Sequence, residues 1–232
     1  MRADALAAAV LAAWCAPAAA PVFPPVAAAF RIPLRLPSRR GIAITFDDGP
    51  HPQGTPAVLA ELERAGARAT FFLVGEQVER RPRLAAEIVA AGHEVAIHGN
   101  RHVLLLRRSP RAVLHDYEQA ADVIANATGT APALYRPPYG VFSAPALALV
   151  RRLGWTPLLW SRWGRDWEAR ATDQAIAARA ATALAAGDVV LLHDADFYSS
   201  ADSWRRTVAA LPLVLASAAA TGEPLVTVSQ SR

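Results

Sequence analysis

The stretch Gly41-Ile-Ala-Ile-Thr-Phe-Asp-Asp-Gly-Pro50 decides the fold, because a short apolar run ends there in two adjacent carboxylates and a Gly-Pro turn. A run of this length, bounded by turn residues, is typical of a buried strand. A second apolar run, over residues 94–97, leads directly into His98-Gly-Asn-Arg-His102. One Asp and two His at strand ends, with a spare carboxylate beside them, indicate a three-ligand metal site for hydrolysis.

The rest of the chain repeats the same arrangement of a short apolar run followed by an amphipathic stretch. The apolar runs cover residues 42–46, 70–74, 94–97, 133–135, 156–160, 188–192 and 225–228. Helices are predicted between them, over residues 55–65, 81–91, 110–126, 143–153, 172–186 and 203–220. Alternation of this kind predicts an α/β fold of about seven parallel strands in one domain. Closed up it is a distorted (β/α) barrel, and opened out it is a doubly wound sheet.

Polar residues at the ends of the runs favour the barrel. In a β/α barrel the carboxyl ends of the strands converge on one face, where catalytic groups collect. Five segments would then contribute to one pocket, with the following residues: Asp47, Asp48, His98, His102, Arg136, Asp166 and His193.

Composition narrows the class of protein. The chain has 232 residues, 53% of them hydrophobic, which is enough for one well-buried core. All 24 basic residues are arginine, scattered or in pairs, and the formal charge is only +4. We therefore expect no nucleic-acid groove and a monomeric protein. The single cysteine, Cys15, excludes an internal disulfide.

Residues 1–36 form an N-terminal segment rich in Ala and Pro, and we expect a catalytic domain over residues 37–232. Residues 5–30 carry no charge, and prolines interrupt the run from Pro17 onward. This pattern is similar to a secretory signal peptide, which predicts an exported or cell-envelope protein. A packed N-terminal helix and a retained anchor are the alternatives, and only the anchor would involve a membrane.

The two carboxylates need different roles, because neighbouring side chains on an extended segment point to opposite sides. One can bind a metal while the other faces the water beside it. An Asp-rich turn that caps the next helix is the structural alternative. His98 and His102 are four residues apart, a spacing that places both rings on one side of a helical turn or tight loop.

Together these motifs resemble the polysaccharide deacetylase family, also known as the NodB-homology domain or carbohydrate esterase family 4. The resemblance extends from about residue 41 to the C-terminus and depends on five segments in order. They are Thr45-Phe-Asp-Asp-Gly-Pro50, His98-x-x-x-His102, Arg136-Pro-Pro-Tyr-Gly140, Asp166-Trp167 and Val190-Leu-Leu-His193.

The resemblance implies a role for each of these side chains. Asp48, His98 and His102 would bind a divalent metal, usually zinc. Asp47 would be the general base for a metal-polarised water and His193 the general acid, oriented by Arg136 and Asp166 respectively. The backbone N–H of Tyr139 would stabilise the oxyanion, and Leu191 and Trp167 would line a slot for the acetyl methyl.

Two positions depart from the family pattern. Gly99 follows the first histidine, where the family usually has Ser or Thr, so Asn100 or backbone groups must support that loop. Trp163 stands where the family usually has an acidic residue. Together with Trp167, it is a candidate for sugar stacking, whereas core packing is the better interpretation of Trp155 and Trp160.

The predicted function is removal of N-acetyl groups from an amino-sugar polymer or oligosaccharide, of the peptidoglycan or chitin type. Three alternatives remain open at this point. They are an O-acetyl esterase acting on acetylxylan-type polysaccharide, a cyclic-amide hydrolase on the same fold, and a sugar-binding pseudoenzyme.

Overall fold

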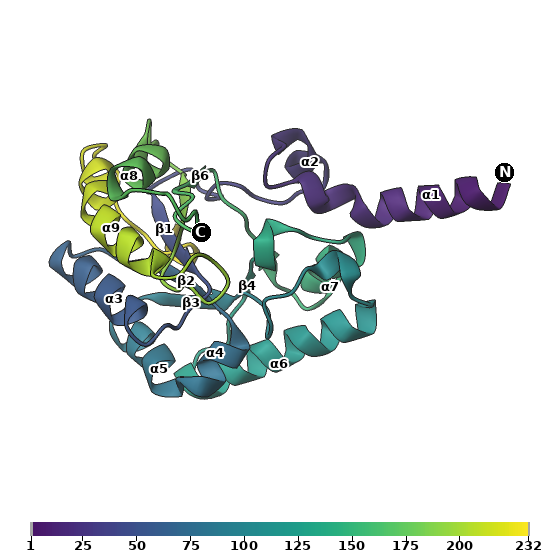
Figure 1. Ribbon diagram of the computed structural model, residues 1–232, viewed down its shortest axis with the longest axis horizontal. Coiled ribbons are helices and arrows are strands. Elements are labelled where there is room, and N and C mark those ends of the chain that lie inside the picture. Colours follow the sequence, from purple (N-terminus) through teal and green to yellow (C-terminus); the bar gives the residue numbers. More distant parts are fainter. Residues whose placement is uncertain (1, 232) are drawn as a thin grey trace.

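A curled parallel sheet forms the centre of the computed structural model, which describes residues 2–231 (Figure 1). Its strands lie in the order β5-β4-β3-β2-β1-β7-β6, and every paired neighbour is parallel. The strands are β1 (Ala43–Asp47), β2 (Thr70–Leu73), β3 (Glu94–Ile97), β4 (Leu134–Tyr135), β5 (Thr156–Pro157), β6 (Arg162–Trp163) and β7 (Val189–His193). The prediction of a distorted barrel with seven parallel strands is confirmed, and β5 and β6 are its two edges.

The sheet differs from the sequence prediction in one strand. Residues 225–228 form no named strand, and Leu225 makes only an isolated parallel bridge with Ile42. The seventh strand is instead β6, which pairs with β7 through Arg162 and Trp163. Asp166 follows β6 and is separated by this strand from the fifth apolar run, residues 156–160. Strand β6 has only two residues, and one of them is the charged Arg162. No apolar run in the sequence therefore indicates this strand.

Helices surround the outside of the sheet, and all six that the sequence predicts are present (Figure 1). They are α3 (Gly54–Arg64), α5 (Pro82–Ala90), α6 (Pro110–Thr128), α7 (Ala144–Arg152), α8 (Asp173–Ala181) and α9 (Ser203–Ala219). Ser109, Ser143 and Thr172 cap three of them by accepting a hydrogen bond from a backbone N–H three residues on. A further short helix, α4 (Gly75–Arg80), was not predicted.

The core lies between the sheet and these helices. All five residues of β1 are buried, as are all four of β2. Sheets of parallel strands are covered on both faces, which explains why the strands are continuous apolar runs instead of alternating ones. The register pairs Asp47 at the end of β1 with His193 at the end of β7. Two candidate catalytic residues are therefore fixed side by side by the sheet itself.

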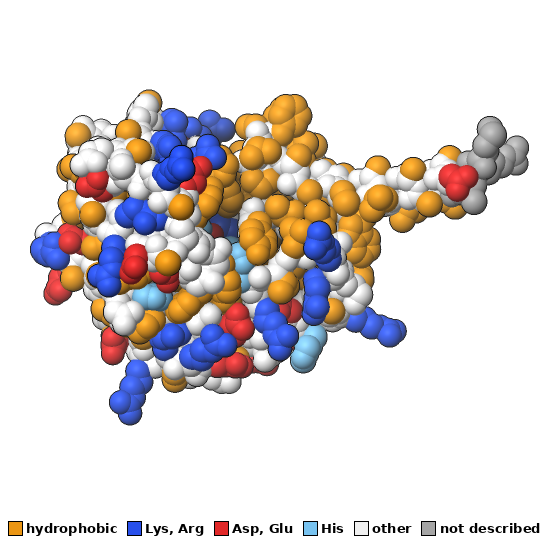
Figure 2. All heavy atoms as spheres, viewed as in Figure 1, with side chains coloured by type: hydrophobic (Ala, Val, Ile, Leu, Met, Phe, Trp, Pro, Cys, Tyr) orange, Lys and Arg blue, Asp and Glu red, His pale blue; other side chains and the backbone are white. Residues whose placement is uncertain are grey.

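The N-terminal segment consists of α1 (Arg2–Cys15), the 3₁₀ helix η1 (Ala16–Ala19) and α2 (Pro24–Ala29). Helix α1 points away from the body (Figure 1), and its side chains over residues 5–15 are apolar (Figure 2). Its base is attached where the indole N–H of Trp14 donates to the carbonyl of Leu106, 3.2 Å away. Ile32 and Leu36 are buried against the core. Within residues 2–231, no helix combines the length and the apolar character that a membrane crossing requires.

Candidate active site

One pocket at the carboxyl ends of the strands collects the side chains that the sequence singles out. Its volume is about 270 Å³. Its lining combines titratable and aromatic side chains. The lining residues are Asp47, Asp48, His98, His102, Tyr139, Gly140, Trp160, Trp163, Trp167, Leu191, His193, Tyr198 and Ser199. Arg136 and Asp166 lie behind this surface, where each contacts one of the lining residues.

Asp48, His98 and His102 form a compact cluster in which one ligand atom from each residue lies within 4.8 Å of the others. The Oδ1 atom of Asp48 is 3.4 Å from Nε2 of His98 and 3.4 Å from Nε2 of His102. Among the described residues this buried oxygen has no hydrogen-bond partner. A buried carboxylate oxygen facing two imidazole nitrogens fits a divalent cation, which would satisfy all three groups.

The protonation states of these side chains also suit a cation. Burial would raise the pKa of Asp48, but the close imidazole of His98 and the charge of His193 lower it to about 2. Burial lowers the pKa of His102 to about 4, so its ring is neutral. A metal-bound carboxylate must be ionised and a metal-bound imidazole neutral, and Asp48 and His102 meet these conditions at neutral pH.

The two adjacent carboxylates do not point to opposite faces of a strand. Asp48 has left β1 and adopts a left-handed backbone conformation with φ of 80°. This turn brings its side chain into the same pocket as that of Asp47. The expectation from an extended segment is therefore wrong about direction, although the two carboxylates do have different partners.

Asp47 is held by a buried arginine. The guanidinium Nη1 of Arg136 donates to Oδ1 of Asp47 at 2.6 Å and to the hydroxyl of Thr45 at 2.9 Å. The other guanidinium nitrogens donate to the carbonyls of Leu158 and Leu159. With all three nitrogens occupied, the arginine is fixed and leaves Oδ2 of Asp47 toward the pocket.

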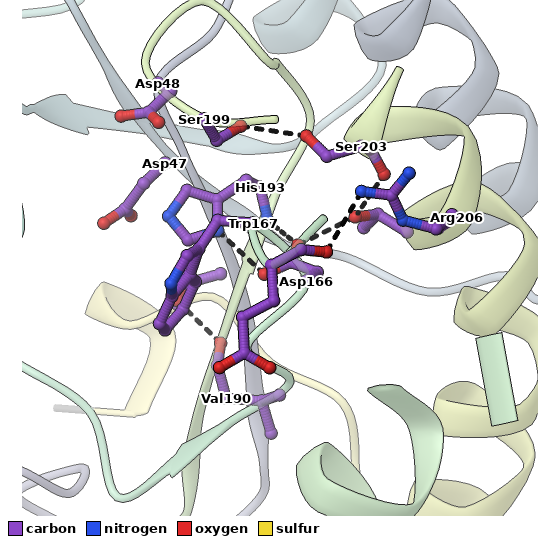
Figure 3. A network of polar contacts seen from close by, with 12 residues as sticks. Asp47, Asp48, Asp166, Trp167, Val190, His193, Ser199, Ser203 and Arg206 are labelled. Atoms are coloured by element: carbon purple, nitrogen blue, oxygen red, sulfur yellow. Dashed lines mark hydrogen bonds and ion pairs between the residues drawn. The ribbon is translucent and has the colours of Figure 1, made fainter. Parts of the chain in front are cut away.

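A second pair in the pocket joins His193 to Asp166 (Figure 3). Nδ1 of His193 is 2.9 Å from Oδ1 of Asp166, whose Oδ2 accepts from the His193 backbone N–H at 2.7 Å. The hydroxyl of Thr207 also donates to Oδ2, at 2.7 Å. These three contacts fix a fully buried carboxylate behind the imidazole.

The charge of Asp166 decides the protonation of His193. Burial lowers the pKa of His193, but the charge and hydrogen bond of Asp166, with smaller contributions from Asp48 and Asp47, raise it to about 10. A cation bound to Asp48 would offset the contributions of Asp48 and Asp47 and leave that of Asp166. The imidazole is therefore a proton donor at neutral pH.

Three tryptophans, Trp160, Trp163 and Trp167, form an aromatic wall of the pocket. Trp160 and Trp163 have ring centroids 5.6 Å apart, and Trp163 and Trp167 are also 5.6 Å apart. Trp167 meets the ring of His193 edge-on at 5.4 Å, and Leu191 lies beside it in the lining. Trp160 is largely buried, as its interpretation as a core residue predicts, yet it also lines the pocket. The predicted slot residues Leu191 and Trp167 are thus together.

The loop of the two histidines is supported in a way that the sequence did not reveal. Oδ2 of Asp116, on α6, accepts from the backbone N–H of Asn100 at 2.9 Å, and Oδ1 accepts from that of Arg101 at 3.1 Å. Gly99 has φ of +85°, and a Cβ there would lie 3.2 Å from Asp116. An acidic residue on a neighbouring helix therefore takes the bracing role of the missing hydroxyl. No spacing rule connects Asp116 to this loop.

This geometry defines a class of protein before any comparison is made. A cluster of one Asp and two His, with a held carboxylate on one side and a held imidazolium on the other, is a metal-assisted hydrolase site.

The chain belongs to the polysaccharide deacetylase family, whose model matches residues 35–158. A chitooligosaccharide deacetylase of a Bradyrhizobium species is 38% identical over 156 residues, which cover 67% of this chain and 71% of that protein. A peptidoglycan-N-acetylglucosamine deacetylase of Bacillus cereus is 34% identical over 192 residues, covering 82% of this chain and 86% of the relative.

Solved structures agree with this assignment. A peptidoglycan N-acetylglucosamine deacetylase superposes with a TM-score of 0.80 at 25% identity, covering 86% of this chain and 92% of that one. A family 4 carbohydrate esterase from Streptomyces lividans, in complex with acetate, has a TM-score of 0.71 at 31% identity and covers 79% and 90% of the two chains. The family resemblance inferred from the five motifs is therefore confirmed, and the chain is a carbohydrate-esterase-type hydrolase.

Proposed function

We propose that this protein is a zinc-dependent deacetylase that removes N-acetyl groups from an amino-sugar polymer of the peptidoglycan or chitin type. The observation that carries the proposal is the arrangement of the pocket: a cluster suited to a metal shares it with a carboxylate held by Arg136 and an imidazolium held by Asp166. The named relatives act on chitooligosaccharide or peptidoglycan, which supports the substrate class.

Zinc is proposed because two imidazoles and one carboxylate are a common catalytic zinc set. When bound, the cation would supply Lewis acidity, polarising both water and the acetamide carbonyl. Asp48, His98 and His102 would hold it, with Oδ1 of Asp48 and the two Nε2 atoms directed at it.

The remaining residues would move protons and orient the substrate. Asp47 takes a proton from the attacking water, and Arg136 keeps its carboxylate in place. His193 gives a proton to the departing amine, which is needed because an amine anion is a very poor leaving group. The backbone N–H of Tyr139, at the pocket lining, stabilises the developing oxyanion.

The aromatic wall suits the proposed substrate. Sugar rings present apolar C–H faces that pack on indole, and Trp163 and Trp167 offer such faces in the pocket. The acetyl methyl would lie against Leu191 and Trp167. We also propose that the protein is exported or associated with the cell envelope. The apolar N-terminal segment supports this location, and a cell-wall polymer would be a substrate found there.

Acetate release tests the proposal. We expect the purified protein to release acetate from N-acetylated chitin oligosaccharides or peptidoglycan, to lose activity with a chelator, and to regain it with Zn²⁺. Asp47→Ala is the inactive control. Activity that survives chelation would contradict the metal assignment, and release from acetylated xylan alone would favour the O-acetyl esterase alternative.

Asp166→Asn is expected to move the alkaline limb of the pH–rate profile to lower pH by about 1 to 3 units. The raised pKa of His193 depends on the charge of Asp166, so the neutral amide lets the imidazolium lose its proton at a lower pH. Acetate release measured across pH checks this. Thr207→Val is the matched control, because it removes one hydrogen bond and keeps the charge. An unchanged alkaline limb in Asp166→Asn would exclude His193 as the acid.

A further inference from the structure

The ring of His102 lacks the support that its partner ligand has. Nδ1 of His98 is 2.9 Å from the carbonyl of Arg136, to which it can donate. Nδ1 of His102 is buried and has no hydrogen-bond partner among the described residues. Metal-binding histidines almost always donate their second ring N–H to a fixed acceptor, which sets the orientation of the ring. Some other contact must orient His102.

Stacking provides that contact. The ring of Tyr198 lies parallel to that of His102, with centroids 4.2 Å apart and an interplanar angle of 7°. Tyr139 meets the same imidazole edge-on, with centroids 4.4 Å apart and an angle of 67°. Tyr139 is 56% exposed, whereas Tyr198 is half-buried in the pocket lining. Tyr198 is therefore the better-held of the two rings.

The hydroxyl of Tyr198 is anchored to helix α4. It donates to Oε1 of Glu76 at 2.7 Å and accepts from Nε2 of Gln77 at 3.0 Å. Two hydrogen bonds at the far end of the ring fix both its position and its tilt. A tyrosine held in this way can impose an orientation on the imidazole beneath it.

Helix α4 is in turn attached to the loop that carries the histidines. The backbone N–H of Gly75 donates to the carbonyl of Gly99 at 3.0 Å, and that of Glu76 donates to the carbonyl of Asn100 at 2.9 Å. A Cβ at Gly75 would lie 2.2 Å from Oδ1 of Asn100, so only glycine permits this approach. The loop, the helix and Tyr198 thus form a closed set of contacts around His102.

We propose that Tyr198 is a positioning residue that orients His102 for metal binding by stacking, in place of a hydrogen bond to Nδ1. The inference rests on the proposed metal site and adds to it a determinant of affinity outside the ligands. It also assigns a role to α4, whose Glu76 and Gln77 hold the hydroxyl of the stacking ring.

Zinc affinity of the metal-free protein, measured by competition with a chromogenic chelator, tests the proposal. We expect Tyr198→Leu to raise the Kd for Zn²⁺ by about tenfold or more, the range found when groups that orient metal ligands are removed. Tyr198→Phe keeps the ring but loses both hydrogen bonds of the hydroxyl, so we expect a smaller rise, of about threefold.

Phe197→Leu is the matched control. Phe197 is the neighbouring aromatic residue of the same loop; its ring packs on His51, with centroids 4.9 Å apart, and meets the ring of Tyr198 only edge-on, at 6.2 Å. It should leave the Kd for Zn²⁺ unchanged, whereas a general loosening of the loop would weaken zinc binding in both leucine variants alike. Equal losses in Tyr198→Leu and Phe197→Leu would therefore overturn the proposal.

Asp48→Ala separates this proposal from the one on which it rests. If Asp48→Ala loses zinc while Tyr198→Leu binds as tightly as the parent, the metal site stands and the stacking role is wrong. If Asp48→Ala binds as tightly as the parent, the metal site itself is wrong. Should circular dichroism show that Tyr198→Leu is unfolded, Glu76→Ala replaces it. We then expect a Kd raised about threefold, and an unchanged Kd overturns the proposal.

Discussion

Asp47→Asn is expected to lower the rate of acetate release about 10³-fold while the protein still binds zinc. The amide has almost the same shape as the carboxylate and can still accept from Arg136, but it cannot take a proton from water. General-base catalysis contributes about 10² to 10⁴ in rate, which sets the size of the effect. The measurement is acetate release at saturating Zn²⁺, with zinc content determined on the same sample.

The adjacent residue supplies the control for this prediction. Asp48→Asn should lose zinc, because Oδ1 of Asp48 faces both imidazoles while its neighbour faces the arginine. The two neighbouring amide substitutions therefore separate proton transfer from metal binding. If Asp47→Asn keeps more than a tenth of the parent activity, or loses its zinc, the assignment of Asp47 as the base is wrong.

Arg136→Met is expected to lower the free energy of unfolding by about 3 to 5 kcal/mol, the usual cost of removing one partner of a buried ion pair. Arg136 is fully buried, with its guanidinium 3.9 Å from the ring centroid of Phe72. Methionine replaces the stem of the side chain but leaves Asp47 buried without its counter-charge. Urea unfolding of the metal-free protein at neutral pH measures the change.

The double variant Arg136→Met/Asp47→Asn tests the reason for the loss. With no charge left to compensate, part of the stability should return relative to Arg136→Met alone. Activity should be lost in both variants, because both disable Asp47. A single variant that loses less than about 1 kcal/mol would show that the guanidinium is not the main partner of the buried carboxylate.

The strand ends that carry catalytic or metal-binding residues could be predicted from the sequence, because each of these residues directly follows an apolar run. Asp47, His98 and His193 are all of this kind, and the parallel sheet brings their positions together. Strand β6 and helix α4 could not be predicted in the same way. Strand β6 has only two residues, one of them the charged Arg162. Helix α4 begins at Gly75, where glycine is required because Asn100 comes too close for a Cβ atom.

Groups that orient the catalytic residues were harder to recognise from the sequence than the catalytic residues themselves. Thr207 on α9 and Asp116 on α6 act through one and two hydrogen bonds, respectively, to distant loops, and any helix contains such residues. In the sequence, Tyr198 is only one of several polar residues that follow His193. Its contact with His102 depends on how the loop over residues 194–202 folds back, which no periodic pattern specifies.

Asp47 and His193, the two residues proposed to transfer protons, are paired across two adjacent strands of the sheet. A slip of one residue between these strands would turn one of the two side chains away, so the backbone ladder protects their alignment. Trp167, a proposed sugar-stacking residue, lies instead on a connecting segment, and such segments tolerate exchange far better than the ladder does. A lineage, or a protein engineer, can therefore retarget this scaffold to another glycan by altering its loops while the reaction centre stays intact.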